Sequence, residues 1–243
     1  MNPDEYKKMY DLEDHYWWFV GRRHLALGLM RKYSKGGRVL DLGCGTGVVL
    51  RDLEPLGDPM GLDMSELALG FCQKRGLPKL IQGDGQALPI QNDTLSAVIG
   101  LDIFEHIPDD RKAFEEAFRI LKPGGHLVLS VPAFMSLWGP HDIALMHFRR
   151  YRLRELRNKL KKAGFQPVRT SYSVFFLFPI VVIVRFFEKR RKGEAKANLV
   201  PVPKWMNKLL IWVQNVEAFL ILRFPLPWGS SVVAVARKPE NAT

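Results

Sequence analysis

The feature that most constrains the fold is the stretch 38–48, where an apolar run leads into three closely spaced glycines. It reads Arg-Val-Leu-Asp-Leu-Gly-Cys-Gly-Thr-Gly-Val, with an acid at position 41 and glycines at 43, 45 and 47. A strand that enters a glycine-rich turn and then a helix lets backbone N–H groups approach a ligand where a Cβ would block them. In the dinucleotide-binding fingerprint the third glycine comes three residues after the second, whereas here it comes two residues after the second. The stretch therefore predicts a ligand-binding turn, with a packing turn as the alternative.

Two further acids follow predicted strands. Asp63 comes 20 residues after Gly43, where a carboxylate can accept hydrogen bonds from both hydroxyls of a ribose. It could instead cap the next helix, although Ser65 suits that position better. Asp84 and Gly85 form a turn after the third predicted strand, and an ordinary Asp-Gly turn is the alternative.

The stretches 97–108 and 121–132 complete a series of five motifs, which in this order resembles the class I S-adenosylmethionine-dependent methyltransferases. The resemblance implies that the first acid and glycine turn hold the methionine end of S-adenosyl-L-methionine, the second acid its ribose, and the third its adenine. This sequence departs from the family pattern at Leu95-Ser96, where the family usually has an aromatic residue followed by an acid. The positions that it assigns to the cofactor are Asp41, Gly43, Cys44, Gly45, Gly47, Asp63, Met64, Asp84, Gly85 and Leu101.

The alternation of short apolar strands with helical stretches predicts an α/β fold, with the sheet covered on both faces. With the resemblance, this implies a Rossmann-like, mostly parallel seven-stranded sheet and a helical insertion before the last strand. The expected strands are 38–42, 58–63, 78–82, 96–102, 125–131, 165–172 and 231–237. The expected units are an N-terminal helical lid at 1–35, a cofactor domain at 36–173, an insertion at 174–228, and a final strand and tail at 229–243.

Candidate acceptor-binding residues lie in two segments. The aromatic stretch 16–23 resembles the lid of a bacterial subgroup of the family, which suggests Trp18 and Arg22, with core packing as the alternative. The loop 133–151 is long enough to suggest a function, and it carries His147, Arg150 and Tyr151. The alternative for this loop is a structural linker with solvated charges.

Methyl transfer from a sulfonium requires mainly alignment and exclusion of water. An acceptor hydroxyl or acidic carbon would also need a base, and His106 is the candidate because an ordinary histidine titrates near neutrality. Capping of its loop is the alternative. The sequence shows no metal-ligand spacing, so we expect no metal, and it indicates no particular oligomeric state.

The positive charge is concentrated late in the chain. Residues 149–223 hold 18 Lys or Arg and 4 Asp or Glu, a net charge of 18 − 4 = +14, against +11 for the whole chain. Within them, an 11-residue apolar run at 174–184 precedes the basic run Lys189–Lys192. Such a pairing favours a helix lying on an anionic membrane surface, and a small-molecule, lipid-like or lipid-linked acceptor. One alternative is that the apolar run forms a hairpin packed as core, with a water-soluble acceptor. The alternative for the positive charge is a basic face that only contacts solvent.

Three other functional classes compete with this interpretation. A nucleotide-dependent oxidoreductase conflicts with the spacing of the glycines. A nucleic-acid methyltransferase would explain the positive charge, but Leu101–Phe104 stands where amino-group DNA enzymes commonly have an Asp or Asn, two prolines and an aromatic residue. A non-catalytic cofactor-binding regulator stays open. The two separated cysteines and the absence of a secretory signal predict a cytoplasmic protein. The apolar and basic insertion adds the expectation of a peripheral position at the inner membrane face.

Overall fold

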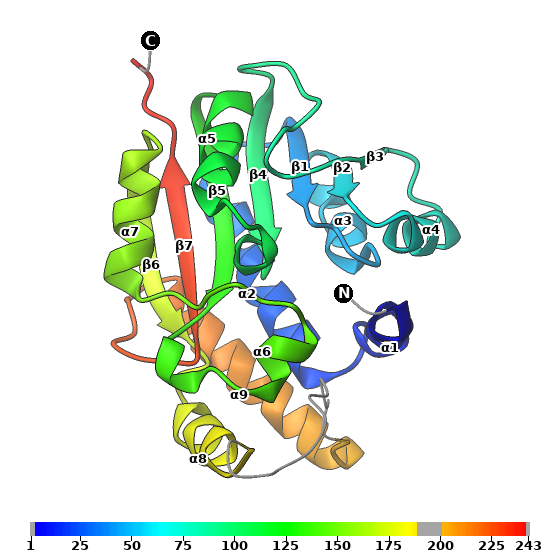
Figure 1. The fold of residues 1–243 in the computed structure, drawn as a ribbon, viewed down its shortest axis with the longest axis vertical. Coiled ribbons are helices and arrows are strands. Elements are labelled where there is room, and N and C mark those ends of the chain that lie inside the picture. Colours follow the sequence, from blue (N-terminus) through cyan, green and yellow to red (C-terminus); the bar gives the residue numbers. More distant parts are fainter. Residues whose placement is uncertain (1–2, 189–200, 242–243) are drawn as a thin grey trace.

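The computed structural model describes residues 3–188 and 201–241. One seven-stranded sheet crosses the molecule in the order β3-β2-β1-β4-β5-β7-β6, as Figure 1 shows. The first five strands are parallel, and β7 runs antiparallel between β5 and β6. The predicted fold class is therefore confirmed. The strands are β1 (Arg38–Leu42), β2 (Asp58–Asp63), β3 (Leu80–Gln82), β4 (Leu95–Leu101), β5 (Leu121–Pro132), β6 (Gln166–Ser173) and β7 (Ser231–Arg237).

Alternation along the central strands separates two cores. Leu40 and Val98 face a core shared with α5 (Asp110–Ile120) and α7 (Leu153–Lys162). Val39 and Ile99 face the opposite core, which is closed by α2 (Trp17–Tyr33), α3 (Val48–Asp52) and α9 (Lys204–Ile221). Parallel strands covered on both faces are apolar along most of their length, which explains why these runs were easy to predict.

The shorter elements lie mainly between strands or before the first one. They are α1 (Pro3–Leu12), α4 (Glu66–Lys74), α6 (Pro140–Ala144), α8 (Phe178–Glu188) and the 3₁₀ turns η1 (Glu54–Leu56), η2 (Phe104–His106) and η3 (Met135–Leu137). The loop 133–151 is thus partly helical. Several strand boundaries differ from expectation. The largest difference is at β5, which begins at Leu121 and not at 125 because Leu121 pairs with Leu95 across a bulge.

The described part of the insertion contains the helices α8 and α9, near the carboxyl ends of the parallel strands (Figure 1). Along α9 the sequence places one apolar stripe, made of Trp205, Leu209, Val213, Val216 and Leu220. This stripe is not the buried face of the helix, because Trp205 and Leu209 are exposed and the other three residues are only partly buried. The buried face consists instead of Gln214, Glu217, Ala218 and Ile221.

Gln214 and Glu217 are polar yet buried, because each has a local structural role. Gln214 packs against α2, where a Cβ on Gly21 would come 2.6 Å from the Gln214 Cβ. The Glu217 carboxylate accepts hydrogen bonds from three successive backbone N–H groups at residues 174–176. The basic run Lys189–Lys192 lies outside the described residues.

Candidate functional site

The glycine turn follows β1 with all three of its glycines in the left-handed region. Their φ angles are 72° at Gly43, 55° at Gly45 and 89° at Gly47, a conformation that disfavours side chains with a Cβ. Space is also restricted, because a Cβ on Gly43 would lie 2.5 Å from the Ile103 side chain. Between them, Cys44 is buried with its Sγ 3.9 Å from that of Cys72.

Asp63 at the end of β2 is held against this turn. Its carboxylate accepts from the Gly45 N–H at 3.0 Å and from the Ser65 N–H at 2.9 Å. Burial raises the Asp63 pKa, and these backbone hydrogen bonds partly oppose the shift. Ser65 caps α4 as predicted, by accepting from the Ala68 N–H at 3.3 Å. The Asp63 carboxylate is therefore fixed in place beside the glycine turn.

Asp41 is the least satisfied acid of the turn. It is buried, and its Oδ2 atom has no hydrogen-bond partner among the described residues. Burial, followed by the negative charge of Asp63, raises the Asp41 pKa to about 7. A buried acceptor without a donor costs free energy, so this atom is suited to receive a hydrogen bond from a ligand.

The other predicted cofactor positions lie along the same edge of the sheet. Asp84 closes its own turn by accepting from the Gln86 N–H at 2.9 Å, and a Cβ on Gly85 would lie 2.9 Å from Ile107. Leu101 is buried at the end of β4, whereas Met64 is exposed after β2. This edge is where an open α/β sheet binds its ligand.

Helix α1 and the turn after it lie over the glycine turn and supply Met9 and Glu13, which the sequence did not single out. A Cβ on Gly45 would lie 2.9 Å from Met9. The Glu13 carboxylate accepts from the Thr46 hydroxyl at 2.5 Å and from Arg75 at 2.6 Å. These contacts connect residues distant in sequence, so no local motif could have identified them.

Arg22 on α2 forms an ion pair with Asp102, which follows β4. Asp102 also accepts from the Ser130 hydroxyl at 2.9 Å, and its pKa is lowered because Arg22 and Ser130 outweigh the effect of burial. Trp18 and Arg22 line a small pocket whose other walls come from the ends of β4, β5 and β7 and from Gln214. The structure thus brings both predicted lid residues to one pocket.

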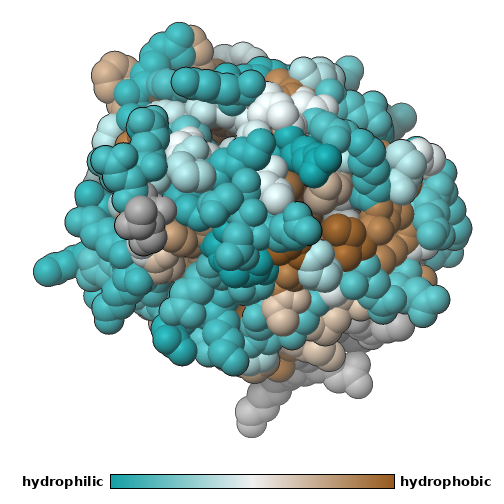
Figure 2. All heavy atoms as spheres, turned by 90° about the horizontal axis from the view of Figure 1, so that it is seen from above, coloured by the Kyte–Doolittle hydropathy of each residue, from teal (hydrophilic) through white to brown (hydrophobic). Residues whose placement is uncertain are grey.

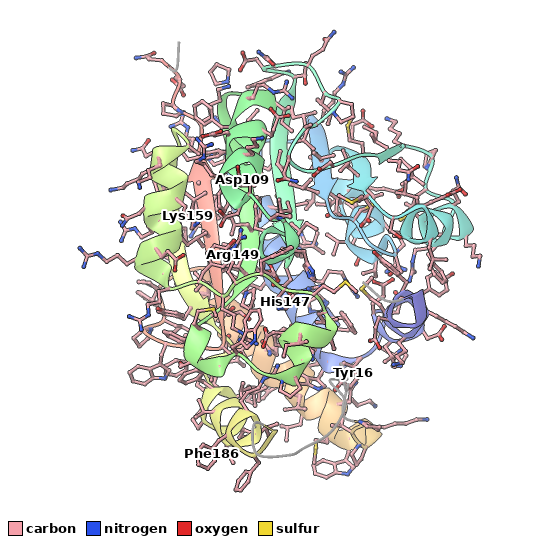
Figure 3. The ribbon with its side chains drawn as sticks, in the orientation of Figure 1. Tyr16, Asp109, His147, Arg149, Lys159 and Phe186 are labelled. Atoms are coloured by element: carbon pink, nitrogen blue, oxygen red, sulfur yellow. The ribbon has the colours of Figure 1, made fainter. Side chains whose placement is uncertain are left out.

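The loop 133–151 is organised around the buried carboxylate of Asp142. Arg150 donates to both of its oxygens, at 2.7 and 3.0 Å, and the His147 Nδ1 lies 2.9 Å from Oδ1. Although burial opposes it, the hydrogen bonds from His147 and Arg150 lower the Asp142 pKa. Figure 3 shows His147 near the carboxyl ends of the parallel strands.

Arg150 and Tyr151 are both buried. Arg150 also donates to the Ala133 carbonyl at 3.1 Å, and the Tyr151 hydroxyl donates to Asp110 at 2.8 Å. Both side chains are therefore held by contacts within the protein, and their direct contact with an acceptor stays a prediction.

His106 follows β4 on the turn η2, beside His147. The two ring centroids are 4.5 Å apart and the rings are nearly perpendicular. Burial, followed by the neighbouring imidazole of His147, lowers the His106 pKa to about 4. Its imidazole is consequently neutral at physiological pH.

The parallel strands, the glycine turn and the acids at the strand ends define the class I S-adenosylmethionine-dependent methyltransferase fold. Residues 40–129 match a family model described as a methyltransferase domain. The match shows a methyltransferase domain over this part of the chain.

Similar proteins come from diverse sources. A rice 2-methyl-6-phytyl-1,4-hydroquinone methyltransferase is 29% identical over 63% of this chain and 45% of its own length. A Mycobacterium leprae phthiotriol/phenolphthiotriol dimycocerosates methyltransferase is 35% identical over 38% of this chain and 36% of its own. The chain thus matches less than half of either relative. The Haemonchus contortus phosphoethanolamine N-methyltransferase 2 structure has a TM-score of 0.60 at 17% identity, covering 88% of this chain and 52% of that one, and supports the fold.

Proposed function

We propose that this protein transfers the methyl group of S-adenosyl-L-methionine to a lipid-like or lipid-linked acceptor at a membrane surface. The residues at the sheet edge fit the cofactor on two observations. The glycine turn has the left-handed backbone that glycine favours at Gly43, Gly45 and Gly47, and the Asp41 Oδ2 atom is a buried acceptor without a donor among the described residues. In this proposal Asp63 accepts from the ribose hydroxyls and Asp84 from the adenine amino group.

The cofactor supplies an activated methyl group on a sulfonium, so the protein must align the acceptor and exclude water. In this proposal α1 and α2 close over the cofactor, and Trp18, Arg22 and His147 face the acceptor. Arg150 and Tyr151 position the loop that carries His147. His106 is neutral, so its imidazole can accept a proton from an acceptor hydroxyl or acidic carbon.

The observation that carries the choice of acceptor is the exposed apolar surface of the insertion. On α8, Ile180 and Phe187 are each 59% exposed, and on α9 Trp205 and Trp212 are 65% and 62% exposed. Figure 3 shows Phe186 at the outer end of the molecule, pointing away from the sheet. A cluster of exposed large apolar side chains favours an interaction surface.

The position of this surface favours a membrane as its partner. No helix among residues 3–188 and 201–241 is long and apolar enough to cross a bilayer, but an apolar helix in a basic segment suits binding at the interface. The opposite end of the molecule, seen in Figure 2, is mainly hydrophilic. Both curated relatives carry apolar acceptors in their names, a phytyl hydroquinone and a dimycocerosate, which also supports an apolar acceptor.

Flotation with vesicles tests the membrane step. The double variant Phe186→Ser and Phe187→Ser should bind anionic vesicles at least about tenfold more weakly, because each phenylalanine contributes up to about 2 kcal/mol when buried. A control, Leu67→Ser with Val168→Ser, removes two exposed apolar side chains from α4 and β6 and should bind like wild type. Absence of wild-type binding at low salt would favour a water-soluble acceptor.

The acceptor is tested by incubating the protein with labelled methyl donor and separate lipid, metabolite and nucleic-acid fractions. Label recovered in the lipid fraction supports the proposal. Label recovered only in the metabolite or nucleic-acid fraction contradicts the lipid assignment but preserves the methyltransferase activity. Cofactor binding without label in any fraction would favour a regulator.

A further inference from the structure

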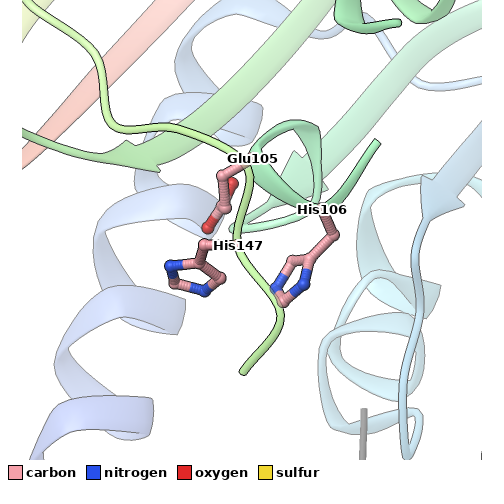
Figure 4. A group of neighbouring side chains, drawn as sticks. All are labelled: Glu105, His106 and His147. Carbon is pink, nitrogen blue, oxygen red and sulfur yellow. The ribbon is translucent and has the colours of Figure 1, made fainter. Parts of the chain in front are cut away.

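Three side chains capable of binding a metal ion meet beside the Arg22–Asp102 pair. Glu105 and His106 lie on η2, and His147 comes from the loop before α7. One donor atom from each lies within 4.8 Å of the other two. Figure 4 shows the Glu105 carboxylate and the two imidazoles gathered around a common space.

The carboxylate of Glu105 is the most unusual member of the group. Its side chain is 0% exposed, and neither oxygen has a hydrogen-bond partner from another described residue. Burial of an acid without a partner carries a large free-energy cost, and coordination of a cation is one of the ways that proteins offset it. The Phe148 N–H donates to the Glu105 backbone carbonyl at 2.8 Å, which ties the two loops together at this point.

Each of the two imidazole rings is oriented by a partner on one of its nitrogens. The His147 Nδ1 pairs with Asp142 at 2.9 Å, which leaves its Nε2 lone pair for another partner. Asp142 is itself fixed by Arg150 and by the Gly139 N–H at 2.9 Å. The His106 ring interacts with the Leu145 backbone. Carboxylate or carbonyl groups on the outer nitrogen are the usual support of metal-binding histidines.

We propose that Glu105, His106 and His147 bind a divalent first-row transition-metal ion, such as Zn²⁺. Two imidazoles and one carboxylate are a donor set that suits these metals. Ligand bonds of about 2.0–2.2 Å place neighbouring donors roughly 3.3–3.5 Å apart in a tetrahedral site, so the side chains need to move inward by about 1 Å.

Such an ion would be held by three protein ligands, which leaves a coordination position for water or an oxygen atom of a ligand. It would also cross-link the segment after β4 to the loop 133–151. From the sequence we expected no metal, because no metal-ligand spacing occurs along the chain. These three ligands come from two loops that lie together only in the folded protein. The proposal does not depend on the nature of the methyl acceptor. A metal ion bound to His106 would occupy the lone pair that proton transfer needs, so the metal-binding role and the base role of His106 are alternatives.

Metal binding is tested on purified, tag-free protein after treatment with a chelator and dialysis. Zn²⁺ is titrated in competition with a chromophoric chelator, in the absence of cofactor and acceptor. We expect one Zn²⁺ per chain, with affinity reduced at least about tenfold in Glu105→Gln and in His147→Ala. The control His126→Gln removes a histidine near the start of β5, far along the strand from the cluster, and should bind Zn²⁺ like wild type.

Near-ultraviolet circular dichroism checks that the variants are folded. Co²⁺ added to the wild-type protein gives a second readout that needs no substitution, because coordination by imidazole changes its visible spectrum. The absence of stoichiometric Zn²⁺ and of a spectral change in the wild type overturns the proposal. So does equal Zn²⁺ affinity in the wild type and both folded variants. Because neither measurement involves methyl transfer, either result leaves the proposed function to its own tests.

Discussion

The pKa of Asp41 makes the stability of the fold depend on pH. Folding raises the pKa of Asp41 from 3.8 to about 7. The protonated Asp41 therefore contributes to the free energy of unfolding in full below about pH 4, and this contribution is lost as the pH rises through about 7. Asp41→Asn cannot titrate, so its stability relative to wild type should increase by roughly 2–3 kcal/mol between pH 5 and pH 8. Urea denaturation of both proteins at the two pH values measures this. A difference that is constant with pH would contradict the assignment.

Asp63 should contribute to cofactor affinity more than other acids on its strand. Asp63→Ala removes the acceptor for two ribose hydroxyls, at roughly 1.5–3 kcal/mol for each charge-assisted bond, and also releases the Gly45 N–H. Calorimetry with S-adenosyl-L-methionine should show at least about tenfold weaker binding. Asp58→Ala, at the exposed start of β2, should leave the affinity unchanged. Unchanged affinity in folded Asp63→Ala would refute the ribose assignment.

Arg150 should affect stability before it affects chemistry. Arg150→Ala leaves the fully buried Asp142 carboxylate without its bidentate partner, and breaking a buried pair in this way costs about 3–5 kcal/mol. Thermal denaturation should therefore show a large decrease in the melting temperature. A variant with unchanged stability and reduced turnover would instead favour the direct acceptor contact suggested by the sequence.

The contact between α2 and α9 can be tested at the level of helix packing. Alanine favours a helix over glycine by about 1 kcal/mol, yet a Cβ on Gly21 would meet the Gln214 Cβ at 2.6 Å. We expect Gly21→Ala to destabilise the protein by about 1–3 kcal/mol through overpacking. Gly70→Ala on α4, which has no neighbouring atom within 4 Å of the new Cβ, should stabilise it. Equal effects in chemical denaturation would show that this packing is not tight.

The elements of the sheet were predictable because each apolar run is bounded by turn residues or acids. The seventh strand was found late in the chain for the same reason, with its bounds at Ser231 and Arg237. The stripe on α9 was not predictable, since its buried positions depend on Gly21 and on the backbone that Glu217 caps. The grouping of Glu105, His106 and His147 likewise depends on how two loops meet, which no local pattern reports.

At the scale of the whole molecule, the uneven charge should make vesicle binding depend on salt. Residues 149–223 carry +14 and the rest of the chain −3, since 11 − 14 = −3. Each basic residue near an anionic surface contributes about 1 kcal/mol, and the screening length falls from about 10 Å at 0.1 M salt to about 3 Å at 1 M. Flotation with anionic vesicles should therefore decrease several-fold over this range. Binding that does not change with salt would leave the exposed apolar side chains as the sole contact.

The position of β7 also bears on how the chain reaches its folded state. This strand follows every other strand in the chain, yet it pairs with β5 on one side and β6 on the other. Until β7 has emerged from the ribosome, β6 cannot join the sheet and one edge of β5 has no partner. Unpaired edges and distant pairings slow folding and favour aggregation. During synthesis, the nascent chain therefore carries an incomplete sheet until β7 has been translated.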